Sequence, residues 1–255
     1  MTPFIHIGDV LIPSYTLMAG IGCLLSASLF SFLMVRKNMM RRCSKVIVFA
    51  IIGVIVGGKF FAILSVWLGS LYQGEGLSFM DILMKSGIVY YGGLLGMLLA
   101  CYLFCCWKKI RFAEISDEIA VCIPVFHCFG RVGCFLAGCC YGKESSSTIA
   151  VLYDNGENVV QRIPVQLIEA CFELLFAIFL IILYRQWRGK EEKGLLQLYL
   201  LVYGTFRFII EFFRGDTIRG IYGGLSFSQY ISIILIISFY IKDLRECLYE
   251  RKMIV

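Results

Sequence analysis

Long apolar segments recur along the whole chain, and most of the charged residues are gathered between them. Segments of about 20 apolar residues are long enough to cross a bilayer as helices. The pattern predicts seven membrane-spanning helices, over residues 12–35, 46–67, 87–107, 119–139, 165–184, 195–213 and 225–241. We therefore expect an all-α polytopic membrane protein in which residues 1–255 form a single seven-helix domain.

The basic residues between the predicted helices alternate from one side of the membrane to the other. Of the 24 Lys and Arg residues, 16 lie in four segments, 36–45, 108–118, 185–194 and 242–255. Only 5 lie in the segments of the opposite side, and the remaining 3 lie within spans. Because basic loops stay in the cytoplasm, we predict an outer N-terminus and a cytoplasmic C-terminus. Topology accounts for the net charge of +6, so nucleic acid is not needed as a partner.

Two segments predicted to lie on the outer side have a character of their own. Residues 68–86 are too polar to span, and within them residues 77–84 form a short amphipathic piece suited to the membrane interface. Residues 143–164 form an outer loop in which β-branched runs flank Asn155 and Gly156. Asn-Gly between such runs is a strong hairpin signal, so we expect a small β-hairpin there.

Composition excludes an ordinary soluble domain. The chain is 59% apolar and only 16% charged, against roughly 25% charged residues in globular proteins, and its mean hydropathy is +0.81. The N-terminal sequence MTPFIHIGDV has no basic region, which favours a retained first helix over a cleaved signal peptide. Most of the 12 cysteines lie inside apolar runs, where cysteine behaves as a small hydrophobic residue.

Residues 126–142, FHCFGRVGCFLAGCCYG, hold the most unusual charge of the chain. Arg131 lies in this apolar segment with no acid beside it in the sequence. An unpaired charge at membrane depth costs about 3 kcal/mol on insertion scales. The stretch therefore predicts an anionic partner for Arg131.

A second group of charged residues lies in the sixth predicted span. Arg207 and Glu211 are four residues apart and share a helix face, so an intramembrane ion pair is the structural explanation. Arg214 lies seven residues from Arg207 on the same face, which gives two arginines for one acid. The planar guanidinium group suits two-point contacts with phosphate. We therefore predict a site for a phospholipid head group near the outer leaflet.

Several further candidates also have purely structural explanations. Tyr15 has the position of an interfacial aromatic residue. Glu169 lies about one turn into a predicted helix, where an acid complements the helix dipole. Gly92 and Gly93 suit close helix packing as well as the approach of a ligand. His127 is expected to be a buried hydrogen-bonding residue.

The segment GRVGCFLAGCCYG, residues 130–142, resembles the glycine-arginine signature of bacterial prolipoprotein diacylglyceryl transferases. Six other segments resemble further motifs of that family in the same order along nearly the whole chain. They are residues 15–18, 57–59, 91–96, 164–169, 203–214 and 225–229.

The resemblance implies transfer of the diacylglyceryl group of phosphatidylglycerol to the lipobox cysteine of a prolipoprotein signal peptide, with release of glycerol phosphate. It places the protein in the bacterial cytoplasmic (inner) membrane, with the active site toward the outer leaflet, and it implies no cofactor and no metal. The catalytic residues implied are Arg131, Arg207, Tyr91 and Glu211. The substrate-binding residues implied are Arg131, Tyr15, Gly92, Gly93, Gln166, Glu169, Tyr203 and Arg214.

The sequence departs from the family motifs at several positions. Tyr91 and Ile163 stand where the family has histidines, Cys134 and Ala137 where it has asparagines, and Cys139 where it has an acid. A tyrosine, with a pKa near 10, is a poor base for a thiol. Two alternatives therefore stay open, a related transferase with a different acceptor and a phospholipid-binding membrane protein without catalysis.

Three cysteines of the signature stretch, Cys134, Cys139 and Cys140, permit more than one interpretation. Neighbouring cysteines do not readily form a disulfide with each other, and C-x4-C-C is not a usual zinc spacing. Packing, a redox or disulfide role, and metal binding are the three alternatives.

Overall fold

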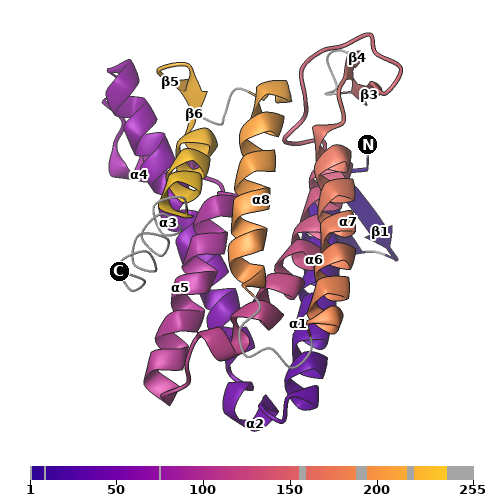
Figure 1. The fold of residues 1–255 in the computed structure, drawn as a ribbon. Helices are drawn as coiled ribbons and strands as arrows, with labels where there is room; N and C mark the ends of the chain where they lie inside the picture. The colour runs from indigo at the N-terminus through magenta and orange to yellow at the C-terminus, as the bar shows by residue number, and fades with distance from the viewer. Residues whose placement is uncertain are drawn as a thin grey trace, which may run out of the picture.

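The computed structural model describes residues 2–8, 10–74, 76–154, 159–187, 194–216 and 221–239. Among these residues, six helical segments are long and apolar enough to cross a membrane, and they run side by side through the molecule (Figure 1). Their helices are α1 (Ser14–Arg36), α3 (Val46–Gln73), α5 (Tyr90–Lys108), α6 (Ala113–Ala137), α7 (Val165–Gln186) and α8 (Leu195–Ile210). The chain is a multi-pass helical membrane protein, as the hydrophobic pattern predicts.

The seventh predicted span, 225–241, is less complete. In the part of the chain that the structure describes, it corresponds to a shorter apolar helix, Phe227–Phe239. At about 1.5 Å per residue such a helix covers about 20 Å, whereas the hydrocarbon core of a bilayer is about 30 Å thick. The count of seven spans and the orientation of the two termini therefore stay predictions.

Helix α6 begins six residues before the predicted span, at Ala113 instead of residue 119. The sequence prediction stopped short because Asp117 and Glu118 are charged, yet both side chains are buried. Glu118 pairs with Lys37 Nζ at 2.8 Å and accepts the hydroxyl of Tyr184 at 2.7 Å. Asp117 Oδ1 accepts the backbone N–H of Leu195 at 2.8 Å, at the start of α8. These contacts explain how two acids are accommodated inside a buried helix.

The helices pack in pairs, α3 against α5, α1 against α6 and α6 against α7. Glycines bring α3 and α5 together: a side-chain atom added at Gly53 would lie 2.8 Å from Ala100 Cβ, and one added at Gly57 2.7 Å from Gly96 Cα. Small residues thus form a close contact between α3 and α5.

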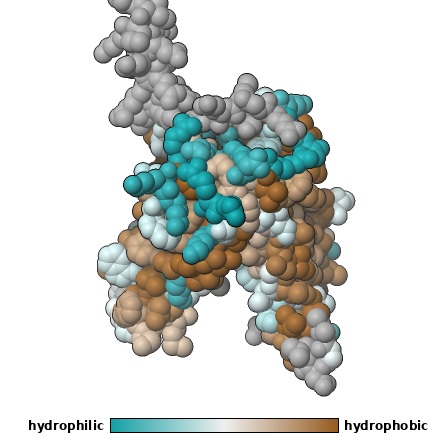
Figure 2. All heavy atoms as spheres, turned by 90° about the horizontal axis from the view of Figure 1, so that it is seen from below, coloured by the Kyte–Doolittle hydropathy of each residue, from teal (hydrophilic) through white to brown (hydrophobic). Residues whose placement is uncertain are grey.

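Hydrophobic side chains cover the flanks of the molecule, while hydrophilic ones gather at one end (Figure 2). This is the end of the short helix α2 (Met40–Cys43), seen from below in Figure 2. An apolar flank with a polar end is the surface that a membrane-spanning bundle requires, because lipid tails cannot solvate charge.

The opposite end carries the short elements. Three two-stranded antiparallel pairs of strands lie there or close to it in the described residues (Figure 1). They are β1 (Phe4–Ile7) with β2 (Val10–Pro13), β3 (Val151–Asp154) with β4 (Val159–Arg162), and β5 (Ile221–Tyr222) with β6 (Leu225–Ser226). The third and fourth strands lie in the segment for which the sequence predicts a hairpin, although the turn at Asn155 and Gly156 lies outside the described residues. Helix α4 (Phe79–Lys85), near the predicted amphipathic piece, lies at the same end (Figure 1).

Candidate active site

The signature stretch, residues 126–142, forms the last part of α6 and the turn after it. The helix ends at Ala137, where Gly138 adopts a left-handed conformation with φ of 74°. Glycine is the usual residue at this position, because it lacks the Cβ that makes positive φ unfavourable. The predicted span to residue 139 is therefore two residues too long, and the chain turns back at this point.

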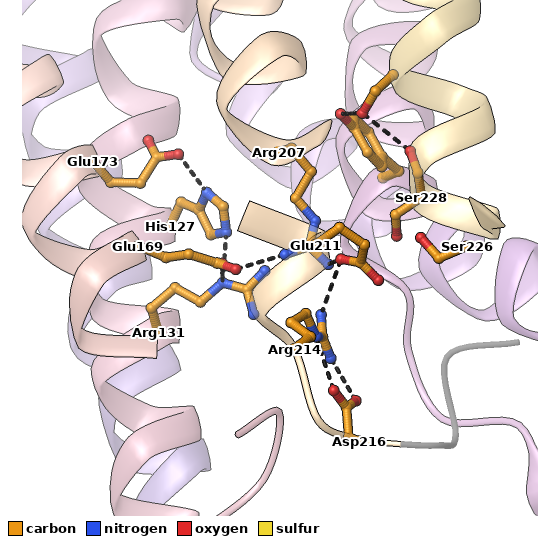
Figure 3. Close-up of polar contacts among 12 residues, drawn as sticks. His127, Arg131, Glu169, Glu173, Arg207, Glu211, Arg214, Asp216, Ser226 and Ser228 are labelled. Atoms are coloured by element: carbon orange, nitrogen blue, oxygen red, sulfur yellow. Dashed lines mark hydrogen bonds and ion pairs between the residues drawn. The ribbon is translucent and has the colours of Figure 1, made fainter. Parts of the chain in front are cut away.

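Buried arginines and acids form a continuous series across α6, α7 and the end of α8 (Figure 3). Arg131 Nε contacts Glu169 Oε2, and Glu169 Oε1 lies 2.6 Å from Arg207 Nη1. Arg207 Nη2 lies 2.7 Å from Glu211 Oε2, which also lies 3.8 Å from Arg214 Nη1. We call these residues, together with Asp216, the ion-pair chain.

The last member of the ion-pair chain, Asp216, binds Arg214 with both oxygens, at 2.6 Å and 2.9 Å. Burial disfavours the charge of Arg214, but the hydrogen bond with Asp216 and the nearby Cys140 and Glu211 outweigh it, so that the pKa of Arg214 lies above its ordinary value. Arg214 therefore carries its positive charge at neutral pH.

The ion-pair chain corrects the charge argument made from the sequence. Arg131 has no acid near it in the sequence, but in the fold Glu169 of α7 contacts it. The predicted surplus of arginine over acid is also wrong, since Arg131, Arg207 and Arg214 are matched by Glu169, Glu211 and Asp216. The three arginines of the ion-pair chain are thus balanced by three acids.

Arg131 is held from the other side by a histidine and a further acid. Its Nε donates to His127 Nε2 at 3.1 Å, and His127 Nδ1 lies 2.9 Å from Glu173 Oε1. Since Nε2 accepts, Nδ1 carries the proton and donates to Glu173, which fixes the neutral tautomer of the ring. His127 is buried and hydrogen-bonded, as expected from the sequence, and its contact with Arg131 places it inside the site.

Aromatic rings enclose this histidine. The ring of Tyr90 stacks on His127 with centroids 3.6 Å apart, and Tyr203 meets it edge-on at 5.2 Å. Tyr90 and Tyr199 share a hydrogen bond between hydroxyls at 2.9 Å. Tyr91 bonds to the hydroxyl of Ser232 at 2.6 Å and packs against Tyr203. These rings pack around His127 and contribute to its burial.

A second set of contacts fixes the turn after α6 to the rest of the site. Gln166 is fully buried, donates to the carbonyl of Cys139 at 2.6 Å and accepts the hydroxyl of Tyr153 at 2.9 Å. Gly142 pairs with Arg214 in an isolated β-bridge. The turn after α6, the β3–β4 hairpin and the end of α8 thus form one rigid assembly around Arg214.

The other residues predicted for the site lie around this network. Tyr15 lies in the first turn of α1 and is 42% exposed, and its Cα lies 3.2 Å from the position of a Cβ on Gly133. Gly92 faces α3, where an added Cβ would lie 2.5 Å from Phe61 Cβ, and Gly93 is in ordinary contact with α3. The structure thus gives Gly92 a packing role, and its predicted role in substrate binding stays a prediction.

Two residues essential to this geometry were not selected from the sequence, Glu173 and Asp216. Glu173 follows Glu169 by four residues and Gln166 by seven, so all three share one face of α7. That spacing was visible in the sequence, as was the spacing of four between His127 and Arg131. The contacts of Asp216 depend on the turn after α8 and had no sequence signal.

Fold and site together define a multi-pass membrane protein with a buried arginine–carboxylate site near one end of its helices. The family model of prolipoprotein diacylglyceryl transferase matches residues 3–242. The chain belongs to this family.

Curated relatives agree with this assignment. The chain is 32% identical over 232 residues to phosphatidylglycerol–prolipoprotein diacylglyceryl transferase 2 of Clostridium perfringens, covering 88% of this chain and 87% of the relative. It is 35% identical to the phosphatidylglycerol–prolipoprotein diacylglyceryl transferase of Clostridium tetani, covering 73% of this chain and 74% of the relative. The enzyme of the same name from Rickettsia bellii is 32% identical, covering 79% and 77%.

Proposed function

We propose that this chain transfers the diacylglyceryl group of phosphatidylglycerol to the lipobox cysteine of a prolipoprotein and releases glycerol phosphate. Family membership supports this reaction. The observation that carries it is the buried ion-pair chain, because three arginines converge at the end of a membrane-spanning bundle. The reaction breaks a carbon–oxygen bond whose leaving group is a phosphate, and its main electrostatic demand is stabilisation of that phosphate.

Arg131 is the best-placed donor for the phosphate. Its contacts with His127 and Glu169 are made through Nε. The two Nη groups are proposed to make a two-point contact with phosphate oxygens. His127 and Glu169 hold the guanidinium in place, so little reorganisation is needed when the substrate binds.

Arg207 is placed between two acids, Glu169 and Glu211, and serves to order the whole site. The remaining implied residues, Tyr91, Gln166, Tyr203 and Arg214, line or support the same region and are proposed to assist substrate binding. The ends of the helices that carry Arg214 and the β3–β4 hairpin lie opposite α2. With the positive-inside argument, this supports an active site facing the outer leaflet of the bacterial inner membrane.

Activity on phosphatidylglycerol vesicles and a lipobox peptide tests the proposal. We expect the peptide to gain the mass of one diacylglyceryl group, and Arg131→Lys to lower the rate by about 100-fold or more, because lysine offers no two-point contact. Arg111→Lys is the matched control, since the side chain of Arg111 is 67% exposed and pairs only with Glu114 among the described residues. A peptide that stays unmodified while a related transferase acts on it would contradict the proposed acceptor.

A transferase with a different acceptor is the second candidate, and Tyr91 favours it. This residue stands in place of the family histidine, and its hydroxyl is engaged by Ser232. If the chain consumes phosphatidylglycerol and releases glycerol phosphate without modifying lipobox peptides, the acceptor has changed. If it retains phosphatidylglycerol without turnover, it is a lipid-binding protein instead.

A further inference from the structure

The three cysteines of the signature stretch meet in space at the outer end of α6. The Sγ atoms of Cys134, Cys139 and Cys140 all lie within 4.8 Å of one another. We call these residues the thiol cluster. The spacing C-x4-C-C is not that of a usual zinc site, but the reversal of the chain after Ala137 brings the three thiols together.

Two left-handed residues bring the thiols together. Gly138 has φ of 74° and Cys140 has φ of 59°. The first reverses the chain after α6, and the second turns the next side chain back toward the helix. Cysteine rarely adopts positive φ, because its Cβ approaches the backbone. The cluster is thus built by a specific backbone conformation, which packing of small apolar side chains does not require.

We propose that the thiol cluster binds one zinc ion through three thiolates, with the fourth position open. Zinc–sulfur bonds of about 2.3 Å in tetrahedral geometry place the sulfurs about 3.8 Å apart. The three sulfurs need to approach by at most about 1 Å from their separation of up to 4.8 Å. Thiolates select soft or borderline metals over magnesium and calcium.

The surroundings of the thiol cluster favour the charge of such a site. Zinc with three thiolates carries a net charge of −1, and Arg131 and Arg214 lie close enough to interact with Cys140. Arg131 lies one turn before Cys134 on α6, and the backbone of Arg214 pairs with Gly142, two residues after Cys140. The two guanidinium groups can therefore offset the negative charge of the occupied site.

The frame of the thiol cluster is rigid, and its mouth is open. Gln166 binds the carbonyl of Cys139 at 2.6 Å, and the Cys139 thiol points to the carbonyl of Cys134 at 3.6 Å. Such outer contacts orient ligands before a metal arrives. Cys139 is exposed while Cys134 is buried, so the thiol cluster reaches the surface at Cys139. A disulfide, in contrast, would use two of the three thiols and leave the third without a role.

Metal titration of the reduced full-length protein in lipid nanodiscs tests the proposal. Zinc is titrated against a chromophoric chelator, and Co²⁺ serves as the spectroscopic probe. We expect about one tightly bound ion per chain, with the thiolate charge-transfer and tetrahedral d–d absorption of cobalt. Removing one ligand in Cys134→Ser, Cys139→Ser or Cys140→Ser should weaken binding by about 100-fold or more.

Cys171→Ser is the matched control, because Cys171 is an exposed cysteine on α7 outside the thiol cluster. This variant should bind zinc as the unchanged protein does. Circular dichroism and lipid-vesicle reconstitution confirm that each variant is folded. The proposal is overturned if zinc binding is unaffected by all three serine substitutions, or if reduced protein gives no cobalt–thiolate absorption. It is also overturned if mass spectrometry of protein isolated without reductant finds two of the three thiols joined as a disulfide.

Discussion

The guanidinium of Arg131 is positioned by groups from two helices. His127 lies one turn before it on α6, and Glu169 approaches from α7. Glu173 fixes the histidine in turn, at 2.9 Å. A buried arginine has several rotatable bonds, and burial alone does not select one rotamer. His127 and Glu169 select the rotamer of Arg131. Glu173 acts on this orientation through its contact with His127 (Figure 3).

Glu173→Leu tests this positioning role. Removing the carboxylate frees the imidazole, and a displacement of about 1 Å at the guanidinium lowers a rate by about 10- to 100-fold. Glu173→Gln keeps an acceptor for His127 Nδ1 and should retain most of the activity. The measurement is the kcat of diacylglyceryl transfer, with thermal unfolding followed in parallel.

Glu144→Gln is the control for this pair, because the Glu144 side chain is 65% exposed and lies on the hairpin side of the molecule. It should transfer at the unchanged rate. Equal activity of Glu173→Leu and Glu173→Gln would show that the carboxylate does not position Arg131.

At the scale of elements, helices α3 and α5 approach more closely than side chains normally permit. Gly57 and Gly96 lie opposite each other, and a Cβ on Gly57 would lie 2.7 Å from Gly96 Cα. Backbone atoms cannot move aside as a flexible side chain can. The helix pair is therefore intolerant of even one added methyl group at this contact.

Gly57→Ala should destabilise the protein by about 1–3 kcal/mol, the usual cost of overpacking a tight contact. Gly20→Ala is the matched control, because an added Cβ at Gly20 meets nothing within 4 Å. This control should be neutral or stabilise by about 0.5–1 kcal/mol, since alanine favours helix. Thermal unfolding in the same detergent measures both. A Gly57→Ala protein as stable as the control would contradict the close packing.

A charged contact joins the C-terminal end of α1 to the N-terminal part of α6. Lys37 Nζ donates to Glu118 at 2.8 Å and to the carbonyl of Glu114 at 2.5 Å. Glu118 is fully buried, so loss of the lysine leaves its charge with too few partners. This contact explains why α6 extends to Ala113 beyond its apolar core.

Lys37→Met should cost about 1–3 kcal/mol of stability, the penalty for a buried charged group that loses a hydrogen-bond partner. Glu118→Gln in the same chain should recover part of this loss, because the amide carries no charge and still accepts the hydroxyl of Tyr184. Denaturation of the two single variants and the double variant gives the coupling energy. Additive losses would exclude a direct pair.

The whole molecule has apolar flanks and a polar end at α2 (Figure 2). Helix α2 lies at one end, while α4 and the β3–β4 hairpin lie at the other (Figure 1). The charge pattern of the sequence assigns the α2 end to the cytoplasm, because basic segments are retained there.

Reporter fusions test the predicted orientation. Green fluorescent protein attached to the C-terminus should fluoresce, and alkaline phosphatase at the same position should be inactive, because the first folds in the cytoplasm and the second outside. Fusions made after Ser147 should give the reverse result, since this residue lies in the predicted outer loop. Phosphatase activity at the C-terminus would overturn the predicted topology.

Hydrophobic runs alone were sufficient to predict the class of protein and most of its helices. Helix α7 begins at Val165, as predicted, and α1 lies within two residues of the predicted limits. Membrane helices are readable from sequence because lipid demands long apolar segments whatever the neighbours are. The start of α6 was missed because charged residues there are satisfied by distant partners, Lys37 and Leu195.

Arg131 shows what the sequence determined by itself and what the tertiary structure decided. Its apolar surroundings predicted a functional role, and the family motifs around it indicated the reaction. The acid that balances its charge is 38 residues away, and the thiols beside it converge through a reversal after α6. Charge balance and ligand geometry depend on distances between helices, and local sequence pattern does not contain those distances. The folded structure therefore decided how the site is neutralised and where its cysteines meet.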